Sequence, residues 1–154
     1  GKRSDLAGSE FLKFFHDIVA GRPFIDLELE SRVQEFCRRA ISQRILNSCH
    51  DCSDGGLLVA LAESSMIGNL GFRGSFKVRG LWDCALLGEI QSRIVVSADP
   101  KYWEILEMMS QEMNVPIMSL GTVGDDKFMV PGMEDLLLSD LSSAWRHGLK
   151  VVEG

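Results

Sequence analysis

The chain has 154 residues, enough for one domain with a hydrophobic core, and its 45% hydrophobic and 25% charged content is typical of a globular protein. The net charge of −6 argues against a nucleic-acid-binding surface, which needs a basic footprint. No apolar run approaches the length of a membrane span, and the polar residues after Gly1 do not form a signal-peptide pattern.

The N-terminal residues 1–25 predict a charged linker followed by one helix. Ser9 is of the residue type that caps helices, and apolar residues recur behind it at helical spacing until Gly21-Arg22-Pro23 ends the pattern.

A second helix is predicted from the cap Asp26 to about residue 43. Its apolar stripe comprises Leu29, Val33, Phe36, Cys37, Ala40 and Ile41. Arg32, Arg38 and Arg39 lie on the other side. An arginine cluster can bind phosphate, but on a helix face it is more often a solvated surface.

Residues 48–57, SCHDCSDGGL, are the chemically richest stretch. The residues before it predict a short buried strand, and an apolar helical run follows it, so the pattern is strand, polar turn, helix. In that geometry Ser53 or Asp54 caps the helix, and Gly55 and Gly56 let the backbone approach a ligand. The free N–H groups of the first helical turn then favour an anion.

The carboxylates of Asp51 and Asp54 would repel a phosphate bound in this turn. A hard cation resolves the conflict, because magnesium binds carboxylate or hydroxyl oxygens together with phosphate oxygens. The stretch therefore suggests a magnesium–nucleotide site. The alternative is a capped helix after a tight turn, in which the glycines serve only the turn geometry.

Cys49 and Cys52 form a C-x-x-C spacing with three interpretations. A redox pair would begin a helix beside a thioredoxin-like strand, and a zinc site would need a second ligand pair, which Cys37 and Cys84 do not form. The third interpretation is two small, reduced residues that flank His50 and Asp51.

A second polar stretch is predicted to lie on a strand over residues 89–97, after a helix stop at residues 68–71 and a strand over residues 72–78. This geometry would place Glu89, Gln91 and Arg93 on one face. The face is either a wall that contacts nucleotide, substrate or another domain, or an exposed surface with an internal ion pair.

The C-terminal part completes an irregular alternation of elements. The predicted elements are a helix from Asp99-Pro100, a strand at 115–120, a turn at 121–126, its hairpin partner at 127–130, a strand at 136–138 and a helix capped by Ser139. The expected fold class is α+β, a mixed sheet covered by helices.

Four stretches resemble, in order, signatures of phosphoribosylformylglycinamidine synthase, the synthetase of purine biosynthesis. They are Leu6–Leu12 (LAGSEFL), His50–Leu57 with Ala60–Glu63 (HDCSDGGL and ALAE), Gly88–Arg93 (GEIQSR) and Leu120–Gly124 (LGTVG). The resemblance covers nearly the whole chain and points to the C-terminal AIR synthase-related domain of that enzyme's second half.

The resemblance implies a C-terminal domain of the AIR synthase type over residues 26–154, with residues 1–25 as the junction to a preceding domain. At such a junction the phenylalanines of the first helix are expected to be partly exposed. It also implies a cytoplasmic, ATP- and glutamine-dependent ligase that converts formylglycinamide ribonucleotide to the amidine, with Mg2+ and ATP or ADP as cofactors.

The site residues are carried over motif by motif. Asp51 and Ser53 are the expected magnesium–nucleotide contacts, and Asp54, Gly55 and Gly56 shape the nucleotide turn. Glu89, Gln91 and Arg93 are further nucleotide-binding candidates. The site is either catalytic or an auxiliary ADP site. Because the family's catalytic histidine and substrate loops belong to earlier domains, the isolated chain is expected to be inactive.

The implied partners are the rest of the same synthetase chain, a glutaminase subunit or domain and, in small forms of the enzyme, an accessory small subunit. Neither nucleic acid nor membrane is expected. The start at Gly1 instead of Met suggests a piece of a longer chain. The ending near Val152 favours the small form of the enzyme, and the large fused form stays open.

Two alternatives stay open. The chain could belong to another member of the superfamily, namely AIR synthase, thiamine-monophosphate kinase or selenophosphate synthetase. It could also be a structural domain that pairs with its sister domain and binds ADP without turnover.

Overall fold

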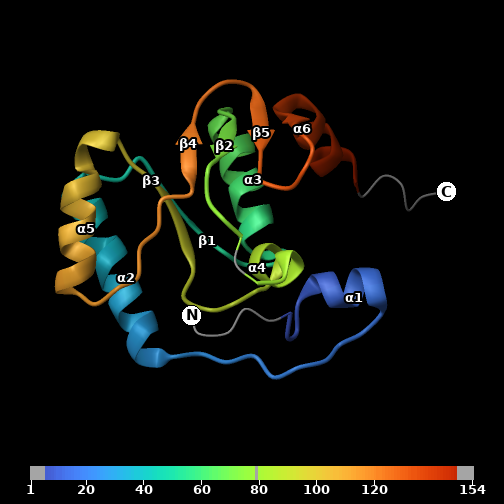
Figure 1. The fold of residues 1–154 in the computed structure, drawn as a ribbon, viewed down its shortest axis with the longest axis horizontal. Coiled ribbons are helices and arrows are strands. Elements are labelled where there is room, and N and C mark those ends of the chain that lie inside the picture. Colours follow the sequence, from blue (N-terminus) through green and yellow to red (C-terminus); the bar gives the residue numbers. More distant parts are fainter. Residues whose placement is uncertain (1–5, 79, 149–154) are drawn as a thin grey trace. The chain divides into compact units, whose positions relative to one another are not determined.

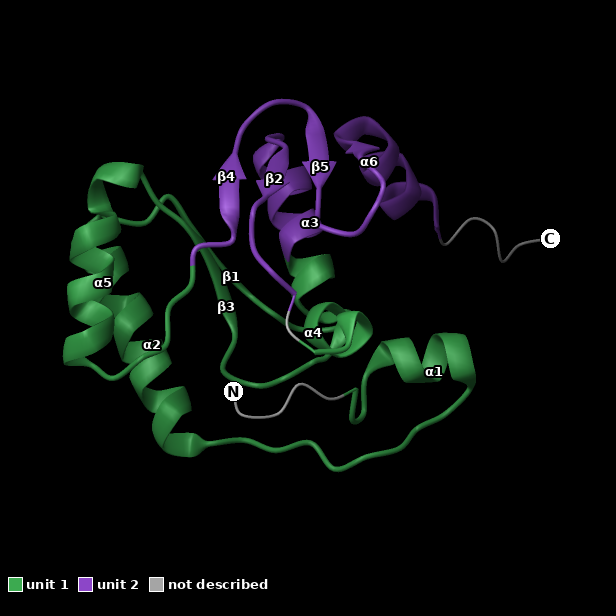
Figure 2. Cartoon of the chain, in the orientation of Figure 1, with its two compact units in different colours: residues 1–60, 79–118 green, residues 61–78, 119–154 purple. Residues whose placement is uncertain are grey.

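The computed structural model describes residues 6–78 and 80–148 (Figure 1). The chain divides into two compact units, residues 1–60 with 79–118 and residues 61–78 with 119–154 (Figure 2). Each unit combines helices with a small sheet, which confirms the predicted α+β class.

The first unit is built around a two-stranded antiparallel ribbon. Its elements are α1 (Glu10–His16), α2 (Leu27–Ser42), β1 (Ser48–Asp51), the beginning of α3 (Gly56–Gly68), α4 (Trp82–Leu87), β3 (Ile94–Ser97), the 3-10 turn η1 (Pro100–Tyr102) and α5 (Trp103–Glu112). β1 pairs with β3 so that Ser48 lies opposite Ser97 and Asp51 opposite Ile94.

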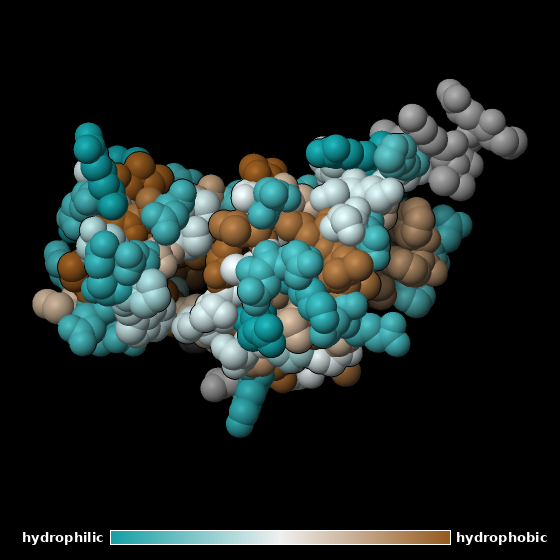
Figure 3. Space-filling model, turned by 90° about the horizontal axis from the view of Figure 1, so that it is seen from above, coloured by the Kyte–Doolittle hydropathy of each residue, from teal (hydrophilic) through white to brown (hydrophobic). Residues whose placement is uncertain are grey.

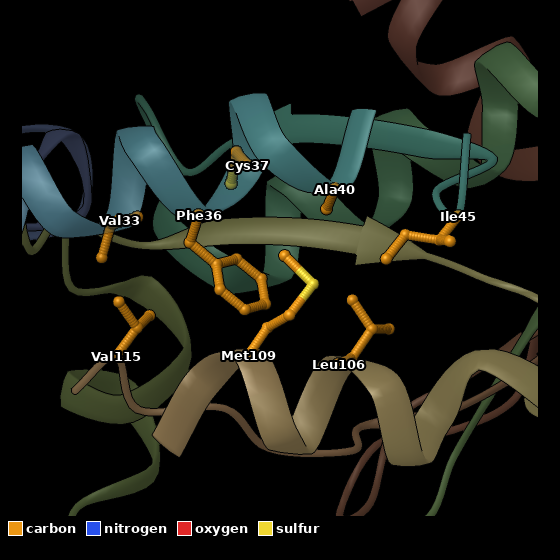
Figure 4. Close-up of a cluster of buried hydrophobic side chains, with 8 residues drawn as sticks. All are labelled: Val33, Phe36, Cys37, Ala40, Ile45, Leu106, Met109 and Val115. Carbon is orange, nitrogen blue, oxygen red and sulfur yellow. The ribbon is translucent and has the colours of Figure 1, made fainter. Parts of the chain in front are cut away.

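The core of the first unit lies between α2 and α5. Figure 4 shows Phe36 pointing from α2 toward Met109 of α5. The buried cluster consists of Val33, Phe36, Cys37, Ala40, Ile45, Leu106, Met109 and Val115. Ile94 and Ala98 of the β3 segment pack against the same cluster, so the helix pair covers one face of the ribbon.

Two predicted helix caps, Ser9 and Asp26, are confirmed, and Asp99, predicted only as the start of a helix, is also a cap. Ser9 accepts a hydrogen bond from the N–H of Leu12, Asp26 from that of Leu29, and Asp99 from that of Lys101. These side chains satisfy backbone donors that have no partner inside the helix.

The apolar stripe of α2 is confirmed except at one position. Val33, Phe36, Cys37 and Ala40 are buried, but Ile41 is 52% exposed. Ile41 follows Ala40 directly, so it is rotated by about 100° around the helix, away from the face that α5 covers.

The apolar residues of the N-terminal segment are largely exposed, as expected for its phenylalanines. α1 ends at His16, earlier than the apolar pattern predicts. Phe14 is 81% exposed and Val19 82%, and Phe15 and Phe24 are also open to solvent.

The second unit contains a mixed four-stranded sheet in the order β4-β2-β5-β6. Its elements are the end of α3, β2 (Phe72–Gly74), β4 (Gly121–Val123), β5 (Lys127–Met129), β6 (Leu136–Leu137) and α6 (Leu138–His147). β2 is antiparallel to β4 and parallel to β5, and β5 is antiparallel to β6.

The predicted hairpin at residues 127–130 is wrong, because β2 lies between β4 and β5. The strand predicted over residues 72–78 ends at Gly74. Pro131 lies beside Gly74 at this point and has no N–H with which to extend the ladder.

Three further predictions in the C-terminal part are wrong. Residues 121–123, predicted as part of a turn, form β4 instead. Residues 115–120 are irregular rather than a strand, because the apolar pattern there reflects the packing of Val115 and Ile117 on the α2–α5 core. Ser139 does not cap α6, which begins at Leu138. Its hydroxyl donates to Asp140 instead.

Apolar side chains also reach the surface among polar ones on the face shown in Figure 3. Within residues 6–78 and 80–148, no helix combines the length and apolarity needed to cross a membrane.

Two substitutions on α2 test the position of the core. Phe36→Ala should lower the free energy of unfolding by about 3–5 kcal/mol, because it removes a buried ring and leaves a cavity. Ile41→Ala should change it by less than about 1 kcal/mol, because that side chain is exposed. Urea denaturation followed by circular dichroism measures both, and equal losses would contradict the described face of α2.

Candidate functional site

The predicted strand–turn–helix junction is present between β1 and α3. Asp51 is the last residue of β1, and α3 begins at Gly56. Asp51, Ser53 and Asp54 are exposed in this stretch. β1 itself is mostly exposed, so the expectation of a buried strand is wrong. It pairs only with β3 in a two-stranded sheet, which leaves its other edge without a neighbouring strand among the described residues.

Two oxygen-bearing side chains meet at the end of β1. The Ser53 hydroxyl donates to Oδ2 of Asp51 over 3.2 Å. A carboxylate and a hydroxyl side by side are oxygen ligands of the kind that magnesium takes from a protein, the remainder being phosphate and water oxygens. Among the described residues, no three His, Cys, Asp or Glu side chains gather to hold a metal ion.

Gly55 and Gly56 are required by the turn itself. Both have positive φ, 79° and 67°, in the region that residues with a Cβ rarely adopt. A Cβ on Gly56 would lie 2.7 Å from the carbonyl oxygen of Gly88 and 2.9 Å from that of Leu86. The close approach allowed by the glycine is therefore to the chain's own backbone at the end of α4.

The strand predicted over residues 89–97 forms only at its second half. β3 begins at Ile94, and Ser92 has a φ of 63°, which breaks the extended conformation. Glu89, Gln91 and Arg93 therefore do not share the face of a strand. They belong to an irregular loop, residues 88–93, between α4 and β3.

The carboxylate of Glu89 reaches the turn before α3. Its Oε1 accepts the N–H of Gly55 over 2.9 Å and the N–H of Glu10 over 2.8 Å. A carboxylate at a helix start is stabilised by free N–H groups and by the helix dipole. Glu89 thus occupies part of the position where the sequence predicted an external anion.

Arg93 is partly buried, and its guanidinium binds the protein backbone. Its guanidinium donates to the carbonyl oxygens of Ala85, over 3.0 Å, and Gly88, over 3.3 Å. These contacts satisfy acceptors at the end of α4. Burial lowers the pKa of Arg93 from its ordinary value.

The loop also contacts α2 and the residue that follows β1. Ser92 donates to the carboxylate of Glu30, and the carbonyl oxygen of Arg93 accepts the N–H of Cys52 over 3.0 Å. Gln91 is exposed. The structure thus brings the two polar stretches together, and it adds Glu30, for which the sequence carried no signal because it lies 62 residues from Ser92.

Two of the cysteines, Cys37 and Cys52, do not have the low thiol pKa of a reactive cysteine. All four are free thiols. Burial raises the pKa of Cys52 to about 11 and that of Cys37 to about 12, whereas a reactive cysteine needs a lowered thiol pKa. The Arg93 charge opposes the shift at Cys52 but is outweighed by burial.

The arginine cluster of α2 forms surface ion pairs. Arg38 and Arg39 pair with Glu35, and Arg39 also approaches Glu112 over 3.4 Å. Arg32 lies 4.0 Å from Glu28. These neighbours favour the interpretation of a solvated helix face.

The comparisons with known proteins agree with the motifs. Residues 1–131 match the family described as "AIR synthase related protein, C-terminal domain". The chain therefore belongs to the AIR synthase related C-terminal domain family.

Its relatives are subunits of one enzyme. Phosphoribosylformylglycinamidine synthase subunit PurL of Thermomicrobium roseum is 43% identical over 149 residues, which is 94% of this chain and 20% of that protein. The subunit PurL of a Synechococcus strain is 44% identical over 141 residues, 88% of this chain and 18% of that protein. The chain thus spans about a fifth of the length of these relatives.

A solved structure supports the fold. The Thermotoga maritima PurL complexed with AMPPCP aligns with a TM-score of 0.67 at 18% identity, over 79% of this chain and 24% of that one. The AIR synthase-type fold expected from the sequence is thereby confirmed.

Gly56→Ala tests the close contact between the turn and α4. It should lower the free energy of unfolding by more than about 1 kcal/mol, because the new Cβ meets backbone atoms and φ is positive. Gly68→Ala is the matched control, since a Cβ there meets nothing within 4 Å and φ is not positive. Thermal unfolding of both variants is the measurement, and a Gly56→Ala variant as stable as the control would contradict the geometry.

Burial of Cys52 predicts a loss of stability at alkaline pH. The unfolded chain releases the thiol proton near the ordinary pKa of 9.0, while the folded chain keeps it to about 11. Between these pH values the unfolded state binds fewer protons, so the free energy of unfolding falls as the pH rises. Urea denaturation at pH 8 to 11 should show a shallower fall in Cys52→Ala, and identical slopes would refute the assignment.

Proposed function

We propose that the chain contributes a magnesium–nucleotide-binding surface to a phosphoribosylformylglycinamidine synthase. The observation that carries this proposal is the exposed pair of oxygen ligands, Asp51 and Ser53, at a strand–turn–helix junction. Its position in a motif resembling that of the enzyme, and relatives that are subunits of this enzyme, support the same conclusion.

In this proposal Asp51 and Ser53 hold the cation, which neutralises the phosphate charge when bound. Asp54, Gly55 and Gly56 shape the turn that presents them, and Gln91 is exposed for contact with the nucleotide. Arg93 does not contact the nucleotide in this proposal. Its guanidinium instead donates hydrogen bonds to backbone carbonyl oxygens at the end of α4.

The whole protein would then be a ligase that uses ATP and glutamine to convert formylglycinamide ribonucleotide to the amidine. Structures of the Thermotoga maritima PurL complexed with ATP and with FGAR, both of which share the fold, support this substrate class over those of other superfamily members. The site in this chain serves either the catalytic or an auxiliary nucleotide.

The partners proposed are the remainder of the same synthetase polypeptide, a glutaminase and an accessory small subunit, in a cytoplasmic setting. A related assembly is described as PurLQS from Thermotoga maritima. The isolated chain would be inactive, and ATP-dependent amidine formation by these 154 residues alone would contradict that.

A second candidate function is a domain that only pairs with its sister domain. The exposed apolar side chains of the N-terminal segment favour it, since Phe14, Phe15 and Phe24 offer an apolar surface to a neighbouring domain.

Titration of Mg-ADP separates the two functions. In isothermal titration calorimetry of the natural full-length polypeptide, Asp51→Ala should weaken binding about ten- to a hundredfold, because a contact to a charged ligand is lost. Asp135→Ala, an exposed carboxylate in the second unit, should bind as the wild type does. If the wild type binds no Mg-ADP, the pairing role is favoured. If Asp51→Ala binds normally, the assigned ligand is wrong.

A further inference from the structure

Side chains of the loop at residues 88–93 form hydrogen bonds to several elements of the first unit. Glu89 bonds the backbone at Gly55 and Glu10, Ser92 bonds Glu30 of α2, and Arg93 bonds the end of α4. Three of the loop's polar side chains therefore have partners inside the protein, at positions 8 to 79 residues away in sequence.

Glu89 makes the contact nearest to the proposed nucleotide site. One oxygen, Oε1, accepts both the N–H of Gly55 and the N–H of Glu10. Gly56, the next residue of the turn, packs directly against the carbonyl oxygen of Gly88. The turn and the loop are thus joined by a hydrogen bond, and they approach so closely that a Cβ on Gly56 would overlap the backbone of Gly88.

A direct role of Glu89 in phosphate binding conflicts with this geometry. A phosphate that took the Gly55 N–H would displace the carboxylate and lie against its negative charge. The exposed oxygens of Asp51 and Ser53 need no such displacement.

We propose that Glu89 is a positioning residue: it holds the backbone at Gly55 and Glu10, and so fixes the bend that presents Asp51 and Ser53 to the cation-bound nucleotide. This inference rests on the proposed function. It predicts that the turn is held mainly because the side chain is long enough to reach two N–H groups, and less because it is charged.

Three substitutions separate reach from charge. Glu89→Gln keeps the length and an acceptor oxygen but removes the charge. Glu89→Asp keeps the charge but is one methylene shorter, and Glu89→Ala removes both. Glu107→Ala, an exposed carboxylate on α5, is the control.

The first measurement is amide hydrogen exchange at Gly55 and Glu10 in the natural full-length polypeptide. Both amides should exchange about tenfold faster or more in Glu89→Ala and Glu89→Asp, as expected for loss of a hydrogen bond, and within about threefold of the wild type in Glu89→Gln. Unchanged exchange in Glu89→Ala would overturn the inference, whether or not the protein binds nucleotide.

The second measurement is Mg-ADP affinity by calorimetry on the same proteins. Glu89→Ala and Glu89→Asp should bind about fivefold or more weakly, and Glu89→Gln and Glu107→Ala close to the wild type. If Glu89→Asp binds well and Glu89→Gln does not, the carboxylate acts by its charge on the ligand, and the positioning role is wrong.

A wild type that binds no Mg-ADP would refute the proposed function and, with it, the link from Glu89 to the nucleotide. The exchange data would still decide whether Glu89 holds the turn, so the two failures can be told apart. A fall in melting temperature common to all three Glu89 variants, with no difference in exchange between Gln and Asp, would also overturn the role assigned to reach.

Discussion

One carboxylate oxygen connects the parts of the first unit that matter for the proposed site. Oε1 of Glu89 accepts the N–H of Gly55 before α3 and the N–H of Glu10 at the start of α1. A helix start leaves backbone donors without partners, and a carboxylate satisfies them at low cost. Because Gly56 also packs on the backbone of Gly88, this contact determines the shape of the bend after β1.

That bend explains the mixture of residues in the motif. Gly55 and Gly56 occupy positive φ and leave no room for a side chain, while Asp51, Ser53 and Asp54 remain exposed. The resulting surface carries negative charge close to Glu89. Such a surface would reject a bare phosphate but suits a phosphate that carries a divalent cation, since the cation balances charge on both sides.

The first unit has only a small sheet and exposes several large apolar side chains. A two-stranded ribbon is only marginally stable by itself, and here the packing of α2 and α5 on one face supplies the stability. The N-terminal segment exposes large apolar side chains, and the chain spans about a fifth of its relatives' length. Both observations fit a domain that works as part of a longer polypeptide.

The sequence by itself determined the local features: the caps at Ser9 and Asp26, the core face of α2, and the strand–turn–helix junction at Asp51. These depend on residues a few positions apart, whose periodicity and hydrogen bonding are visible in the chain. Only the tertiary structure decided that β2 separates β4 from β5, and that Glu89, Ser92 and Arg93 bond to distant parts of the protein. Strand order and such contacts depend on which segments pack together. The same polar residue types occur in ligand sites and in internal loop contacts, so the sequence alone does not distinguish the two.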